Sequence, residues 1–465
     1  MTNKTDNLSI PKNGIKEGES FKRTLTCSMM VLYGVAFMVI TSWVTSFGAA
    51  SVATYGMVAL AYSIATVAMI LSAYSYSQMS KEYPVAGSAY SYANKTMKPQ
   101  VGFLVGWALI MDYVLLPMLC VVASATILTS VWSEVPASVW AIGIIVILLV
   151  VCLMGLVVTI GTNLVIVAIQ VIAMIVMAVM IFRFLGNGGG AGTLFHLDSF
   201  INRAAFEDPD FSVIGLMTGT AILCVNFLGF DAISTLAEEA KNPRKDVGKA
   251  MVLTCIIAGA SFTFYSYIIQ LCWPDSLEGA KNSDVMFAEI MDFVNPMISN
   301  VMCIIYVIGA IACTINSTTS GARIIFAMGR DGLLPKPFAH LTPKRRVPSV
   351  AVIAISAVAC VGIFIDLSMA FSLVSYGALL GFISVNISVI ILYYVKKKER
   401  GAKAILKWLI IPICGAVICL LIWLSLAFMA KIVGTIWMII GLIYLAIQTK
   451  GFKKLPPELD LDQQI

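Results

Sequence analysis

The segment FLGFDAISTLAEEAKNP, from Phe227 to Pro243, places a carboxylate where membrane helices rarely carry one. Asp231 is the only charged residue between Val213 and Ala237, a run long and apolar enough to cross a bilayer. An ionised side chain at that depth is unfavourable in lipid, so it faces protein or a water-filled cavity. We therefore expect a membrane helix that is interrupted near Gly229, with Asp231 beside a cavity.

The chain has the composition of an integral membrane protein. Of its 465 residues, 59% are hydrophobic and 12% are charged, whereas soluble domains average about 25% charged residues. Apolar runs of about 20 residues recur along nearly the whole chain, which predicts an all-α protein with twelve transmembrane helices. These helices are expected to begin near Thr26, Val52, Val101, Ser138, Thr162, Val213, Lys249, Pro296, Val347, Met369, Ile405 and Ile432.

One membrane domain, residues 23–449, is expected between a polar N-terminal tail (1–22) and a polar C-terminal tail (450–465). The 11 cysteines include no CxxC pair and both histidines lie in polar loops, so neither a metal site nor a cofactor is expected. Without a metal constellation or a nucleophile elbow, a membrane enzyme is not expected either. The net charge of +6 is explained by the excess of Lys and Arg expected in cytoplasmic loops of a membrane protein, so it does not require a nucleic-acid partner.

The distribution of basic residues predicts the orientation. When both termini are placed in the cytoplasm, few of the 31 Lys and Arg residues remain outside. Those on the outer side are Arg183, Arg203, Lys281 and Lys431. This asymmetry follows the positive-inside rule and predicts a multi-pass protein of the plasma membrane with both termini cytoplasmic.

Two apolar runs, five spans apart, share a pattern. The first, MMVLYGVAFMVITSWVTSFGAA, contains Gly34, and the sixth contains Gly229, each among aromatic and polar residues. Inverted repeats with broken first helices are common in transporters. We expect repeat one at about 23–185, repeat two at about 212–396, discontinuous first and sixth helices, and two extra C-terminal helices at about 403–449.

The chain resembles the amino acid–polyamine–organocation superfamily of transporters, and within it the bacterial putrescine importers. The resemblance is carried by YPVAGSAYSYANKTM (Tyr83–Met97), VGFLVGWALIMDYVLLPM (Val101–Met118), NFLGFDAISTLAEEAKNPRKDVGKAM (Asn226–Met251) and SGARIIFAMGRDGLLP (Ser320–Pro335). It implies a ten-helix inverted-repeat core with two added helices, substrate held between the broken first and sixth helices, and uptake driven by a proton gradient.

The first helix departs from the family pattern in two ways. Where many amino acid transporters carry a Gly-Ser-Gly segment that holds the substrate carboxylate, this chain has YGVAF, with Gly34 as its one glycine. Where the putrescine importers carry a proline and an acid, Ile40 and Thr45 stand. The pattern of the first helix therefore favours neither an α-amino acid nor a diamine.

Two acids lie deep within spans. Asp112, in LIMDYVLL, is expected to bind a cationic group or to carry the coupling proton, with a structural hydrogen bond as the alternative. Asp231 is expected either to meet the substrate ammonium or to cap the half-helix that follows the break. Both readings of Asp231 remain open at this stage.

The remaining candidate residues surround these acids. Phe37, Phe227, Phe230 and Tyr113 are expected to line the pocket, since an aromatic face attracts a cation by about 0.5–2 kcal/mol. Gly34 and Gly229 are expected to supply free backbone amides. Glu238, at the inner end of the sixth span, belongs either to an inner gate or proton path, or to a solvated ion pair with Lys241 or Arg244. The hydroxyl cluster NSTTSGAR (Asn316–Arg323) fits either a sodium site or helix packing.

The predicted function is a secondary transporter that imports a small amine, a polyamine such as putrescine or an amino acid, by alternating access in symport with protons. Sodium coupling is the less favoured form. The first alternative is an α-amino acid permease or exchanger that holds the carboxylate on first-helix amides, and a remote one is a membrane sensor that binds solute without transport. The expected partners are the substrate, the coupling proton and the lipid bilayer, and the sequence does not specify an oligomer.

Overall fold

A computed structural model describes residues 23–84, 88–155, 160–207, 212–275, 283–330, 332–342 and 347–451. Within these residues nine helices are long and apolar enough to span a membrane, and one bent helix pair forms a further span. Two shorter apolar helices, α6 and α13, occupy the remaining positions predicted from the sequence. The protein is a multi-pass, all-helical membrane protein.

The spans follow one another in chain order. They are α1 (Cys27–Met38) with α2 (Trp43–Thr54), α3 (Val58–Glu82), α5 (Pro99–Val131), α6 (Ala137–Leu153), α7 (Ile160–Gly186), α8 (Val213–Cys224) with η3 (Val225–Phe227) and η4 (Asp231–Glu239), η5 (Pro243–Val247) with α9 (Gly248–Cys272), α12 (Pro296–Arg330), α13 (Ser349–Val361), α14 (Leu367–Val389) with η9 (Ile390–Lys396), α15 (Ala402–Ile405) with η10 (Leu406–Ile410) and α16 (Ile411–Leu424), and α17 (Phe428–Gln448). Two short helices, α4 (Ser88–Thr96) and α11 (Met286–Val294), lie between spans.

The first span is broken, but not where the sequence predicted. α1 and α2 meet at 59°, and Val39 adopts a left-handed conformation with φ of 50° at the end of α1. Gly34 lies inside α1, where an added Cβ would stand 2.7 Å from Ile233 and 2.9 Å from Thr254, so this glycine permits close helix packing. The prediction of a break at Gly34 was wrong.

The first span extends to Thr54, so the second span begins later than the expected start at Val52. Val52 lies within α2, and the second span begins at Val58 after the turn at Tyr55 and Gly56. The sixth span is interrupted where the sequence predicted. Its first half ends at Cys224, and Gly229 has φ of 125° in the connection to η4.

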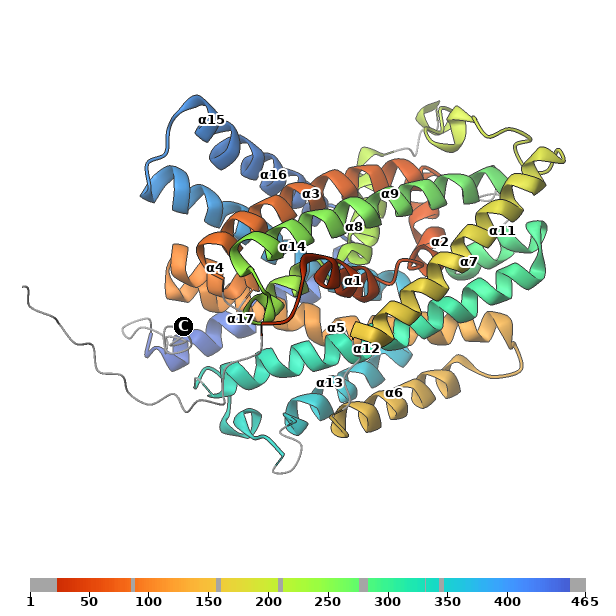
Figure 1. The fold of residues 1–465 in the computed structure, drawn as a ribbon. Helices are drawn as coiled ribbons and strands as arrows, with labels where there is room; N and C mark the ends of the chain where they lie inside the picture. Colours follow the sequence, from red (N-terminus) through yellow and green to blue (C-terminus); the bar gives the residue numbers. More distant parts are fainter. Residues whose placement is uncertain are drawn as a thin grey trace, which may run out of the picture.

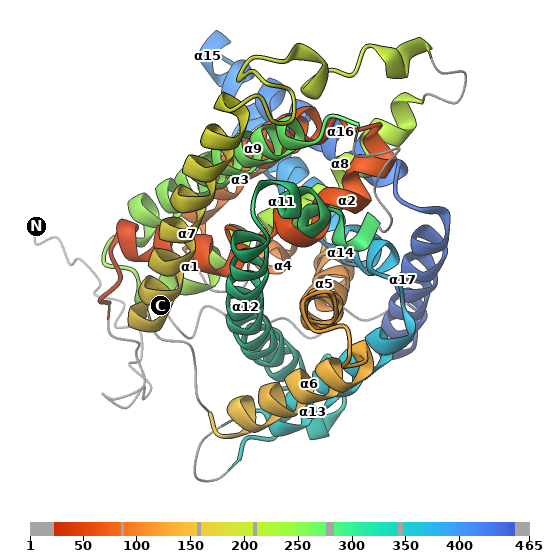
Figure 2. The ribbon, with the colours of Figure 1, turned by 90° about the vertical axis from the view of Figure 1, so that its right-hand side faces the viewer.

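Corresponding spans of the two expected repeats pack on each other. α3, the second span, lies along α9, the seventh, and α5, the third, lies along α12, the eighth. Figure 1 views the bundle from the side, with α4 toward one end and α2 and α11 toward the other. Figure 2 looks along the bundle and shows α6 and α13 side by side at one edge, with α17 on the flank of the core.

One end of the bundle is basic. The end at which α3 stops and α5 starts carries exposed lysines that include Lys81, Lys249, Lys396 and Lys403. We call it the basic end. At this end Leu25 is paired with the chain just after η4, because its N–H donates to the Glu239 carbonyl (3.0 Å) and its carbonyl accepts from Lys241 N (2.9 Å).

Candidate substrate site

A small cavity lies between the two helix breaks. It has a volume of about 30 Å³ and is bounded by the breaks of the first and sixth spans together with α5, α12 and α14. A volume of this size holds about one water molecule. Its lining residues include Phe37, Val39, Ser42, Thr45, Leu116, Cys120, Asn226, Leu228, Tyr306, Cys313 and Phe371.

A buried polar network joins the two broken spans on one side of the cavity. The Asn226 amide nitrogen donates to Ser46 Oγ (2.7 Å) and to the Tyr62 hydroxyl (2.6 Å). Ser46 Oγ and the Tyr62 hydroxyl are themselves 3.1 Å apart. Buried polar groups of this kind are satisfied only in one arrangement, so the network fixes α2 and α3 relative to the sixth-span break.

The first-span break is held by a side chain from a neighbouring helix. Gln170, buried on α7, donates from Nε2 to Thr41 Oγ1 at 3.2 Å. The turn closes locally where Ser42 N donates to the Val39 carbonyl at 2.7 Å. These contacts explain how a β-branched residue can occupy a left-handed conformation at this position, since the surrounding structure determines it.

Asp231 caps the broken chain. Its Oδ1 accepts the Gly229 N–H at 3.2 Å, and its Oδ2 accepts the Tyr113 hydroxyl at 3.3 Å. The side chain is only 2% exposed. Asp231 therefore accepts an amide of the unwound chain, while η4 has no side-chain cap at its first residue. Whether Asp231 also meets substrate stays a prediction, and its two hydrogen bonds leave carboxylate lone pairs for a further donor.

Asp112 is the second buried acid near the breaks. It is 3% exposed, on α5 where α14 crosses at Gly377, and it directly precedes Tyr113, whose hydroxyl donates to Asp231. Its Oδ1 has no hydrogen-bond partner among the described residues. Asp112 and Asp231 are the only buried acids in the described part of the chain, and no lysine or arginine there is buried.

Of the aromatic residues expected to line the pocket, Phe37 lines the cavity between the breaks, and Tyr113, Phe227 and Phe230 are not among its described lining residues. Phe37 lines the cavity and covers Gly229, where an added Cβ would lie 2.8 Å from the Phe37 ring. Phe230 packs beside Tyr76 and Phe382 with ring centroids at 5.5 and 5.1 Å, directly preceding Asp231.

Phe227 points elsewhere. It meets the edge of Phe262 on α9 with centroids 5.3 Å apart, and it is fully buried in that contact. Its observed role is therefore helix packing. Glu238 lies in η4, but its side chain is outside the described part of the structure.

Several cavity residues were not predicted from the sequence. Ser42 was available as a hydroxyl within the first span, and Asn226 as an amide within the sixth. Cys120 and Tyr306 stand in long apolar runs, and only the packing of α5 against α12 brings them to the cavity.

Some hydroxyls in and beside the α12 cluster hydrogen-bond within their own helix. Thr314 Oγ1 donates to the Ala310 carbonyl (2.7 Å), Ser317 Oγ to Thr314 (3.2 Å) and Thr319 Oγ1 to Ile315 (2.8 Å). Ser317 and Thr319 therefore fit the packing interpretation of NSTTSGAR. Asn316 Nδ2 and Thr318 Oγ1 are buried without a hydrogen-bond partner among the described residues, so the sodium-site interpretation stays a prediction.

Comparisons with known proteins agree with this architecture. The amino acid permease family model matches residues 25–455. The low-affinity putrescine importer PlaP of Escherichia coli (strain K12) is 35% identical over 442 residues, which cover 94% of this chain and 96% of the importer. The branched-chain amino acid permease BcaP of Bacillus subtilis (strain 168) is 23% identical over 94% of this chain and 95% of its own length.

A solved structure has the same fold. The crystal structure of the Eremococcus coleocola manganese transporter, in complex with an aromatic bis-isothiourea substituted compound, aligns with a TM-score of 0.52 and 12% identity, covering 92% of this chain and 94% of the transporter. At that identity the likeness concerns the fold alone. From the family match over nearly its whole length, the chain belongs to the amino acid permease family, a family of membrane transporters and not of enzymes.

Proposed function

We propose that this transporter imports a small diamine of the putrescine type in symport with protons. The observation that carries the proposal is the pair of buried acids, Asp112 and Asp231, which no buried lysine or arginine of the described residues neutralises. Buried ionised carboxylates without a positively charged partner are unfavourable, so they acquire a cation or a proton. In this proposal a diamine and a coupling proton supply that positive charge.

Neither Asp112 nor Asp231 is among the described residues that line the cavity between the breaks, so in this proposal the cation binds at the two carboxylates, beyond that cavity. Asp112 has an unpaired oxygen in the described structure, and Asp231 has spare lone pairs beside the Phe230 ring. An ammonium over an aromatic face gains about 0.5–2 kcal/mol. The 35% identical relative is named a putrescine importer, which supports the same substrate class.

The small volume of the cavity supports alternating access. A space of about 30 Å³ holds about one water and no diamine, so the cavity between the breaks has no room for substrate in this conformation. Substrate entry then requires movement of the half-helices on one side of the breaks. We place the basic end in the cytoplasm of a plasma-membrane protein, because basic residues concentrate on the cytoplasmic side.

The test is uptake of labelled putrescine into liposomes. Asp112→Asn and Asp231→Asn are each expected to reduce uptake at least tenfold, because each removes a negative charge and keeps the side-chain volume. Asp275→Asn, in an exposed connection between spans, is the matched control and is expected to transport at the wild-type rate. A protonophore is expected to abolish accumulation. Wild-type uptake by either buried-acid variant would contradict the proposal.

An amino acid substrate is the second candidate, and one structural observation favours it. The first-span break lies at residues 39–42 and not at Gly34. Within it, the Ile40 and Thr41 amides donate no backbone hydrogen bond in the described chain. Such amides can receive a carboxylate. The 23% identical relative is named a branched-chain amino acid permease. Competition of labelled putrescine uptake by leucine separates the candidates, since only an amino acid transporter is inhibited.

A further inference from the structure

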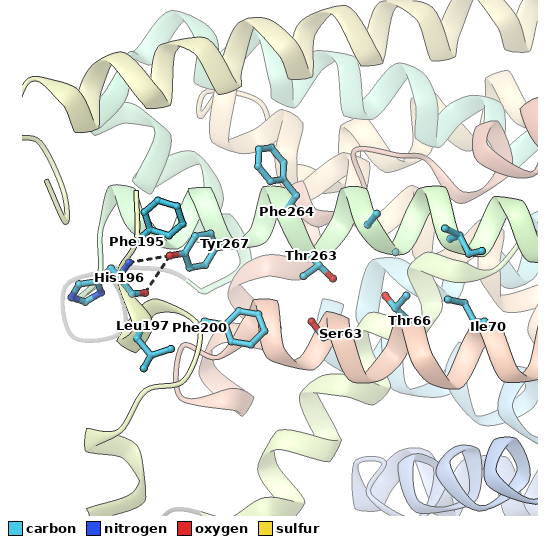
Figure 3. A pocket seen from close by; sticks show the side chains of 13 residues that line it. Ser63, Thr66, Ile70, Phe195, His196, Leu197, Phe200, Thr263, Phe264 and Tyr267 are labelled. Carbon is cyan, nitrogen blue, oxygen red and sulfur yellow. Dashed lines mark hydrogen bonds between the residues drawn. The ribbon is translucent and has the colours of Figure 1, made fainter. Parts of the chain in front are cut away.

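The α3–α9 crease is a surface groove that runs along the packed helices α3 and α9. Two cavities occupy it, one of about 490 Å³ at the basic end and one of about 860 Å³ farther along, and Ile256 lines both. The groove is narrow because the helices approach closely at Gly259, where an added Cβ would lie 2.3 Å from Thr66. Figure 3 shows the second cavity, with Ser63 and Thr66 on one helix facing Thr263 on the other.

Four cations converge on the basic end of this crease. Lys81 comes from α3, Arg244 and Lys245 from η5, and Lys249 from α9, and all four are exposed and line the same cavity. No carboxylate is among the cavity's described lining residues.

The nearest acids in sequence have other partners. Asp246 accepts from Asn242 at 3.4 Å, and Glu82 pairs with Lys397 at 2.8 Å. None of the four cations forms an ion pair with a described residue. Their positive charge is thus available to an anion from outside the chain.

Beyond the cations the wall of the crease becomes apolar. Val252, Leu253 and Ile256 continue the lining along α9, and Leu253 and Ile256 are 38% and 44% exposed. At 1.5 Å per residue, Ile256 lies about 10 Å and Thr263 about 21 Å along the helix from Lys249. At the far end Phe195, Leu197 and Phe200 close the groove (Figure 3).

We propose that the α3–α9 crease binds an anionic phospholipid from the leaflet at the basic end. The phosphate lies among Lys81, Arg244, Lys245 and Lys249, and one acyl chain follows the apolar wall past Ile256. A phospholipid matches both halves of the groove, since basic side chains at the membrane surface attract anionic headgroups and the exposed aliphatic wall lies at hydrocarbon depth. A free phosphate would use only the basic half.

The proposed lipid site is connected through the chain to the sixth-span break. η5 follows η4, the half-helix that begins at the sixth-span break, after three residues. A phosphate held jointly by η5 and α3 fixes the far end of that half-helix against a neighbouring span. Bound lipid therefore stabilises the conformation in which η5 lies beside α3.

The experiment measures lipid binding to the purified full-length protein in detergent. Dioleoyl phosphatidylglycerol is titrated while the apparent melting temperature is followed, and native mass spectrometry counts the lipid retained. The test variant is Arg244→Gln/Lys245→Gln/Lys249→Gln. The matched control is Lys396→Gln/Lys403→Gln/Lys407→Gln, which removes the same charge from exposed positions on η9, α15 and η10 at the same end.

Wild type and the control are expected to gain thermal stability with saturation and to retain one lipid more than the test variant, because a ligand of the folded state stabilises it. The half-saturating lipid concentration of the test variant is expected to rise roughly tenfold to a hundredfold. Phosphatidylcholine and soluble glycerol phosphate are expected to leave the melting temperature unchanged.

Three results would overturn the proposal. These are an equal response of the test variant and wild type, an equal response to phosphatidylcholine, and an equal response to glycerol phosphate, which would indicate a site for soluble phosphate.

Discussion

Replacing Gly229 by alanine tests whether the sixth-span break is held in one backbone conformation. Gly229 has φ of 125°, which a residue with a Cβ adopts at an energy of about 1–3 kcal/mol. The added Cβ would also stand 2.8 Å from Cδ1 and 2.9 Å from Cβ of Phe37, which is 2% exposed and has little room to move. Overpacking of a buried site adds about 1–3 kcal/mol. We therefore expect a loss of about 2–6 kcal/mol in folding stability.

The assay is thermal unfolding of the purified variant in detergent, together with uptake in liposomes. Gly143→Ala is the matched control, because nothing lies within 4 Å of the added Cβ and the site is inside α6. There the same change is expected to be neutral or to stabilise by about 0.5–1 kcal/mol through helix propensity.

A second variant, Gly229→Ala/Phe37→Leu, separates the two contributions. It removes the contact with the Phe37 ring and leaves the backbone strain, so it is expected to recover part of the lost stability. A Gly229→Ala variant that melts at or above the wild-type temperature would refute the reasoning about this break.

Three further predictions concern the site and the outer surface. Tyr113→Phe removes one hydroxyl donor to a carboxylate at 3.3 Å, and we expect about a fivefold to tenfold rise in the uptake KM with the protein still folded. Cys120 and Cys313 line the cavity between the breaks, so bound substrate is expected to slow their alkylation by a small maleimide, whereas exposed Cys360 reacts at an unchanged rate. The Arg203 guanidinium donates to Asp198 at 2.7 Å and holds the pKa of that carboxyl below its usual value. Its stabilising effect is thus present at neutral pH and lost as pH falls through the lowered pKa. Arg203→Gln is therefore expected to lower the melting temperature at pH 7, and its difference from wild type is expected to shrink as the pH is lowered through that pKa.

The sixth-span break was predictable because the residues that produce it are close together in the sequence. A glycine and a carboxylate two residues apart, in an otherwise apolar run, indicate a backbone that leaves the helix and a cap for the freed amide. The structure shows both, since Gly229 has a positive φ and its N–H reaches Asp231.

The first-span break was not predictable by the same rule. Gly34 was the glycine available, but the chain leaves the helix at Val39, a residue type that rarely adopts a left-handed conformation. Its conformation is imposed by tertiary contacts, notably the bond from Gln170 on α7 to Thr41. No local pattern in the first span encodes a partner more than a hundred residues away.

The residues that line the cavity also divide into those that could be predicted from the sequence and those that could not. Phe37 was identified because it lies one turn from the expected break, although the break itself lies just beyond it. Tyr306 could not be identified, because within its apolar run it resembles any core aromatic until α12 packs against α5. Sequence reasoning thus found residues that belong to a break and missed residues contributed by neighbouring helices.

The backbone pairing of Leu25 has a mechanical consequence. Two hydrogen bonds fasten the chain just before α1 to the chain just after η4, so the half-helices on the basic side of both breaks are tied at their far ends. They are also packed together, because Gly34 of α1 lies against Ile233 of η4. The two half-helices are therefore joined to each other, and each is separated from the rest of its span by a break, at residues 39–42 for α1 and at 228–230 for η4. Moving both half-helices together preserves the two bonds, whereas moving either one alone would break them. We therefore expect any opening of the protein on this side to displace the two half-helices together.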